Sequence, residues 1–146
     1  MDLEMLFRGT TPTMIDVAAL LGRVVIGICF VIHGLGKLGL VGTGSLEGFT
    51  AFLEERGVPM PAIQARIAMF SELVGGSLLT LGLLTRPACL LLIGTMVVAG
   101  LVGHRGAGYL ITNDPPGGEY TINLVVISAI LLLLGPGPWS LDALLF

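Results

Sequence analysis

The charged and titratable residues in or at the ends of the long apolar stretches of this 146-residue chain include Arg23, His33, Lys37, Glu72 and Glu119. Histidine exchanges protons near neutral pH, and a neighbouring carboxylate can orient it or accept its proton. A charge at the centre of a membrane helix costs about 2.5–3.5 kcal/mol, so such residues are usually paired or functional. We therefore predict that these five residues form a ligand-binding site, with His33 and Glu72 as the best catalytic candidates.

The composition indicates that lipid surrounds most of this chain. Hydrophobic residues make up 54% of it and charged residues 12%, with a formal net charge of −3 at pH 7. Soluble domains usually contain about 25% charged residues. Seven dispersed Lys and Arg residues form no basic stripe, so no nucleic-acid partner is expected. The apolar content excludes a disordered chain, and two cysteines exclude a disulfide scaffold.

Four apolar stretches are expected to cross the membrane as helices, at about residues 17–35, 63–84, 87–102 and 120–134. A helix needs about 20 apolar residues to cross about 30 Å of hydrocarbon, so the last two stretches are short. The chain has no room for a separate soluble domain. The sequence predicts an all-α fold in which residues 1–146 form a single integral membrane domain, a four-helix bundle. Both termini are then on one side of the membrane.

The first long loop contains a pattern typical of a short amphipathic helix. Apolar residues recur there at steps of three and four, at Leu46, Phe49, Phe52 and Leu53. Ser45 is a suitable N-cap and Gly57 a suitable stop. We expect this helix to lie in the membrane interface, packed against the mouth of the bundle.

The direction of the helices predicts how the polar side chains pair. Side chains lean toward the N-terminus of their helix, so His33 and Glu72 on antiparallel spans lean toward each other. This predicts a His33–Glu72 hydrogen bond or ion pair, and Lys37 with Glu119 is a second candidate pair. A buried pair can also simply fix helix register, so a structural role for Glu72 stays open. Arg23 is better explained as a packing or snorkelling cation.

Several kinds of chemistry are not expected from this sequence. It contains no Cys-x-x-Cys motif, and Cys29 and Cys89 lie singly in apolar runs, where thiols are usually inert. It also lacks a phosphate-binding loop and a dinucleotide fingerprint. We therefore expect no metal site and no evident cofactor, with a quinone as the one candidate ligand or substrate.

Several motifs, in order along the chain, resemble those of the DoxX family of small four-helix membrane proteins. After Arg23 come His33-Gly34-Leu35-Gly36-Lys37, Glu72-Leu73-Val74-Gly75-Gly76, Gly117-Gly118-Glu119-Tyr120 and Gly135-Pro136-Gly137. The resemblance covers about residues 17–146 and implies a location in the cytoplasmic membrane of a prokaryote. It implies a relation to DoxD-type subunits linked with thiosulfate:quinone oxidoreductase. Arg23, His33, Lys37, Glu72 and Glu119 match recurring polar positions of the family.

Three functions are compatible with this sequence. The leading prediction is a small membrane subunit of a quinone-linked redox system, at most an oxidoreductase subunit, whose electrons come from a partner. The first alternative is a non-catalytic scaffold or accessory subunit that stabilises a larger membrane complex. The second is a small-solute transporter, which would need oligomers because four helices rarely enclose a path. The expected partners are membrane lipids and either another membrane protein or further copies of this chain.

Overall fold

The computed structural model describes residues 9–146, and within that range it contains helices and no strands. The helices are α2 (Pro12–Lys37), α3 (Leu46–Glu55), α4 (Pro61–Leu81), α5 (Thr85–Gly103), α6 (Glu119–Leu134) and α7 (Leu141–Leu145). The predicted all-helical class is confirmed. Four helices are long and two are short, so the described residues form six helices rather than the five that were predicted.

Each predicted span coincides with a long helix, although the ends differ. Helix α2 begins at Pro12, where the Thr11 side chain accepts a hydrogen bond from the Met14 amide, and it is longer than predicted. Helix α4 ends three residues early because Gly82 takes a left-handed conformation, with φ of 66°. In the described chain, α2 and α5 are long and apolar enough to cross a membrane, and α6 is apolar but shorter.

The amphipathic helix in the first loop is confirmed as α3. The Ser45 hydroxyl accepts a hydrogen bond from the Gly48 amide at 3.0 Å, which caps its first turn. Gly57, with φ of 68°, follows its last residues. Helix α7, by contrast, was not predicted, because five residues are too short to show a periodic pattern.

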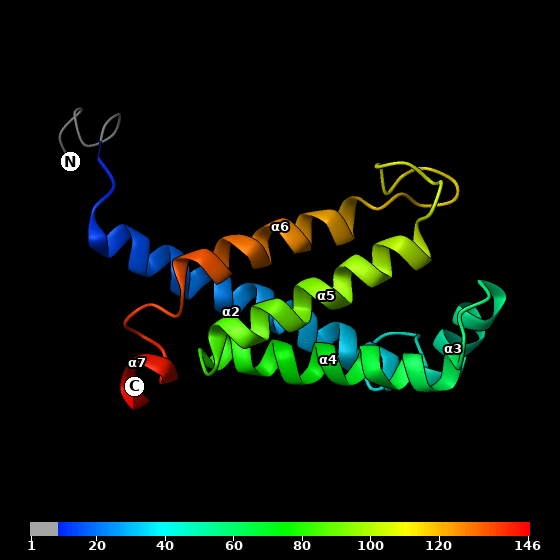
Figure 1. Ribbon diagram of the computed structural model, residues 1–146, viewed down its shortest axis with the longest axis horizontal. Helices are drawn as coiled ribbons and strands as arrows, with labels where there is room; N and C mark the ends of the chain where they lie inside the picture. The colour runs from blue at the N-terminus through cyan, green and yellow to red at the C-terminus, as the bar shows by residue number, and fades with distance from the viewer. Residues whose placement is uncertain (1–8) are drawn as a thin grey trace.

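The long helices pack in the order α2, α4, α5 and α6, and α6 also touches α2 (Figure 1). Close approach of α2 and α4 depends on glycine. A Cβ atom at either Gly27 or Gly76 would lie only 2.7 Å from the carbonyl oxygen of the other. Small residues allow this kind of contact between membrane helices, where backbone approach replaces large interlocking side chains.

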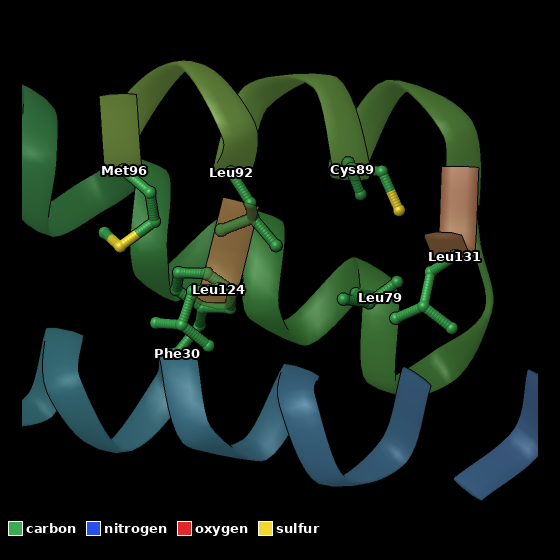
Figure 2. Close-up of a cluster of buried hydrophobic side chains, with 8 residues drawn as sticks. Phe30, Leu79, Cys89, Leu92, Met96, Leu124 and Leu131 are labelled. Atoms are coloured by element: carbon green, nitrogen blue, oxygen red, sulfur yellow. The ribbon is translucent and has the colours of Figure 1, made fainter. Parts of the chain in front are cut away.

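Figure 2 shows the apolar core, in which α2, α4, α5 and α6 all take part. Its buried side chains include Phe30, Leu79, Cys89, Leu92, Met96, Leu124 and Leu131. The outer faces are also apolar, since Leu101 is 68% and Leu133 is 81% exposed. Helices that are apolar both inside and outside suit a protein surrounded by lipid.

The two ends of the bundle are different (Figure 1). The start of α2, the turn between α4 and α5, and α7 lie at one end, here called the terminal end. Helix α3 and the loop of residues 104–118 lie at the opposite end, here called the loop end.

Candidate functional site

A cavity of about 520 Å³ opens between α3, α4 and α5 at the loop end, and it is called the groove below. Helix α5 crosses α4 near their connecting turn and diverges from it toward the loop end (Figure 1). The groove walls are mainly apolar, with side chains that include Phe49, Phe52, Ile67, Leu91 and Val98. Ligand sites commonly have such apolar walls with a few placed polar groups.

An ion pair between α2 and α4 supplies charge to the groove wall. Lys37 Nζ lies 2.5 Å from Glu72 Oε2, and both residues line the groove. The Glu72 side chain is only 4% exposed and that of Lys37 is 18% exposed. Lys37 Nζ also lies 5.0 Å from the centre of the Phe49 ring, within range of a cation–π contact. Glu72 is therefore neutralised by Lys37, whose ammonium group also faces an aromatic wall.

Four further polar residues line the groove: Gln64, Ser71, Thr95 and His104. The Thr95 hydroxyl donates to the Leu91 carbonyl, and His104 Nδ1 lies 2.7 Å from the Pro116 carbonyl oxygen. Sequence reasoning did not assign these residues to a ligand site. The seven-residue spacing of Gln64 and Ser71 was a usable signal, since it places both on one face of a helix.

Gly94 on α5 lines the groove. A Cβ atom built there meets no atom within 4 Å. A larger side chain at this position therefore does not clash with a neighbouring helix. This makes Gly94 a suitable position for blocking the groove while leaving its polar groups unchanged.

His33 has different contacts from those predicted. Its side chain is exposed, and its Nε2 lies 2.6 Å from the Tyr120 hydroxyl on α6. The predicted His33–Glu72 pair is wrong, because Glu72 is bonded to Lys37, one helical turn farther along α2. His33 is not among the residues that line the groove.

Glu119 stabilises a loop rather than pairing with a cation. Its Oε2 accepts a hydrogen bond from the Ile111 amide at 3.0 Å. The predicted Lys37–Glu119 pair is therefore wrong, since Lys37 is bonded to Glu72. Glu119 does not line the groove.

Arg23 is buried at the terminal end, where it binds backbone oxygens. Its guanidinium donates to the Thr80 carbonyl at 3.2 Å and to the Trp139 carbonyl. A second cavity of about 500 Å³ lies beside it, but Arg23 is only 1% exposed. The contacts agree with the packing role predicted for this cation.

Asp142 in α7 completes the terminal end by capping α5. Its two carboxylate oxygens accept hydrogen bonds from the Leu84 and Thr85 amides at 2.6 and 2.8 Å. Burial raises the pKa of Asp142, but these bonds and the charge of Arg23 outweigh that effect and hold the pKa below its usual value. Through these hydrogen bonds the C-terminal segment stabilises the turn between α4 and α5.

The groove is suited to a small amphiphile. Its walls can hold an apolar ring or chain, and Lys37 can donate a hydrogen bond to an oxygen of the ligand. Among residues 9–146, no group of three or more His, Cys, Asp and Glu side chains is placed to hold a metal ion. The chemistry of the groove thus depends on one ion pair and its apolar surroundings.

Comparison with known proteins agrees with this architecture. Residues 18–105 match the DoxX family. "Inner membrane protein YphA" of Escherichia coli (strain K12) is 30% identical over 131 residues, covering 86% of this chain and 89% of that protein. "Putative oxidoreductase CatD" of Bacillus subtilis (strain 168) is also 30% identical, covering 90% and 89%. "Inner membrane protein YqjF" of Escherichia coli (strain K12) is 29% identical, covering 89% and 93%. No solved structure matches the chain.

Proposed function

Because the chain belongs to the DoxX family of membrane proteins, we propose that it binds a lipid-soluble quinone in the groove as part of a membrane redox system. The inner-membrane relatives support a prokaryotic membrane as its location. The observation that carries the proposal is the Lys37–Glu72 ion pair on the wall of an otherwise largely apolar cavity. The relative named for an oxidoreductase supports the redox part.

The quinone ring would lie against the apolar wall formed by α3. Phe49 and Phe52 both line the groove, with ring centres 6.1 Å apart. One quinone carbonyl oxygen would accept a hydrogen bond from Lys37 Nζ. The isoprenoid tail would leave the groove between α4 and α5, past Leu91, toward the bilayer.

The ion pair also provides a way to move protons. Reduction of a quinone to a quinol takes up two electrons and two protons. In this proposal the electrons come from a partner protein, Lys37 donates one proton to one reduced oxygen, and solvent at the loop end supplies the other proton. The negative charge of Glu72 then favours the ammonium form of Lys37, which takes its proton back from solvent. Proton transfer by a positioned side chain is general acid catalysis.

Quinone titration of the purified protein in mild detergent tests the proposal. Gly94→Phe should weaken quinone binding at least tenfold, because the ring occupies the groove volume. Leu101→Phe, on the exposed face of the same helix and outside the groove, is the matched control and should bind as the wild type does. Isothermal titration calorimetry would report the affinity.

Two results would contradict the proposal. One is wild-type protein with no saturable quinone binding, and the other is equal affinity in the wild type and Gly94→Phe. Mass spectrometry of the material that co-purifies adds an independent observation. A stoichiometric protein partner without quinone would favour the accessory-subunit alternative.

A further inference from the structure

His104 lines the groove at the loop end, where α5 stops, and no step proposed above uses it. The residue is half-buried, and its Nδ1 lies 2.7 Å from the Pro116 carbonyl oxygen. A carbonyl oxygen can only accept a hydrogen bond, so Nδ1 carries the proton of this bond. In the neutral imidazole, Nε2 is then an unprotonated acceptor. The ring nitrogen left for a ligand is therefore Nε2.

The loop before α6 holds the Pro116 carbonyl in place. The Gly117 amide donates a hydrogen bond to the Leu110 carbonyl at 2.9 Å. A Cβ atom at Gly117 would lie only 2.5 Å from the carbonyl carbon of Tyr109, so the two sides of the loop are in close backbone contact. The bond that one ring nitrogen of a histidine makes decides which nitrogen is protonated. This loop therefore sets the tautomer of His104.

The aromatic wall of α3 connects the surroundings of Lys37 with the end of α5. Lys37 Nζ lies 5.0 Å from the centre of the Phe49 ring, and the Phe49 and Phe52 centres are 6.1 Å apart. A Cβ atom built at Gly103, the residue before His104, would lie 3.7 Å from Phe52 Cζ. The two carbonyl oxygens of a para-quinone are at opposite ends of its ring. A ring against this wall can therefore direct one oxygen toward Lys37 and the other toward His104.

We propose that His104 is the second proton-exchanging residue of the groove, and that its Nε2 bonds the quinone oxygen remote from Lys37. The inference rests on the proposed function and gives a route to the proton assigned above to solvent. As the partner protein supplies two electrons, Lys37 protonates one oxygen. The imidazolium of His104 breaks its Nε2–H bond to protonate the other, and then takes a proton back from solvent. Histidine suits this task because it exchanges protons near neutral pH.

The protonation state of His104 then decides which form of the ligand it favours. The imidazolium donates to a quinone carbonyl, whereas neutral Nε2 accepts from a quinol hydroxyl. The ratio of quinone affinity to quinol affinity should therefore rise as the pH falls. Other ionisable side chains lie on the elements around His104, and the variants below leave all of them unchanged: Lys37 and Glu72 on the groove wall, Arg56 over Phe52, Arg105, Tyr109 and Asp114 in the loop, and Glu119 in α6.

Isothermal titration calorimetry with a short-chain benzoquinone and its quinol, under anoxic conditions between about pH 5.5 and 8, tests this inference. The wild-type affinity ratio should rise about fivefold or more toward low pH, as expected for one hydrogen bond to a charged group. In His104→Gln the ratio should be nearly constant, because glutamine does not titrate. His33→Gln is the matched control: it removes the other of the two histidines, which is outside the groove, and should keep the wild-type response.

A second measurement needs no variant. Diethyl pyrocarbonate acylates unprotonated imidazole nitrogens, and saturating quinol should protect His104 but not His33 in the wild-type protein. Unchanged labelling of His104 would overturn the inference. A pH-independent ratio in wild type that binds both forms, or a full response in His104→Gln, would also overturn it and leave the quinone site standing. Wild type that binds neither form would contradict the proposed function and this inference together.

Discussion

Helix α2 carries one cation toward each end of the bundle, and the surroundings of the two cations differ. At the terminal end, the Arg23 guanidinium donates to two backbone carbonyls and is 1% exposed. At the loop end, Lys37 binds the carboxylate of Glu72 beside a cavity of about 520 Å³. A cation held by backbone oxygens stabilises the bundle, whereas an ion pair beside a cavity can meet a ligand. The bonding partners distinguish the two roles, although both residues lie on the same apolar helix.

Lys37→Met is expected to have the largest effect on stability. It leaves the Glu72 carboxylate buried without its cation, which costs about 3–5 kcal/mol in comparable pairs. Thermal unfolding in detergent should show a clear fall in Tm. The double variant Lys37→Met/Glu72→Leu should recover most of the loss, because neither charge remains. If Lys37→Met were as stable as the wild type, the Glu72 carboxylate would not depend on Lys37 for its burial, and this prediction would be contradicted.

Arg23→Met is expected to cost about 2–3 kcal/mol, because each lost hydrogen bond from a charged donor costs about 1.5–3 kcal/mol and removal of the buried charge recovers part of that loss. The Thr80 and Trp139 carbonyls lose their donor. Quinone affinity should be unchanged, since Arg23 is outside the groove. Arg66→Met, which removes an exposed arginine, is the control and should change stability little. If folded Arg23→Met protein lost quinone binding, Arg23 would not be purely structural, and the proposed difference between the terminal end and the loop end would be wrong.

Asp142→Asn is expected to have the smallest effect, about 1 kcal/mol, as for loss of a helix N-cap. The folded-state pKa of Asp142 is lowered, so its stabilising contribution is present above the unfolded pKa of about 3.9. That contribution is lost as the pH falls through the lower folded-state pKa. Urea or thermal unfolding between neutral and acidic pH should therefore show a shallower acid decline in Asp142→Asn. An identical decline in both proteins would exclude this role.

Much of the fold could be predicted because it depends on local patterns. Apolar length located the four long helices, and the Ser45 cap with Gly57 located α3. The membrane family could also be predicted from ordered motifs. Helix ends were predicted less accurately, since the early end of α4 depends on the left-handed conformation of Gly82.

The pairing of polar side chains could not be predicted as well. His33 and Lys37 are four residues apart, so choosing between them as the partner of Glu72 requires the axial register of α2 against α4 to better than about 6 Å. Sequence gives approximate depth but not the rotation of each helix about its axis. The Cys29–Tyr120 contact joins residues 91 positions apart, so no local pattern could reveal it.

The central claim is that the loop-end groove, and not the terminal end, receives the quinone. Photolabelling with an azido-quinone, followed by mass spectrometric mapping of the modified residues, tests this directly. The account predicts saturable labelling of groove residues on α3, α4 and α5, suppressed by excess quinone and lost in Gly94→Phe. Saturable labelling confined to the terminal end around Leu20 and Trp139, or none that excess quinone suppresses, would contradict it.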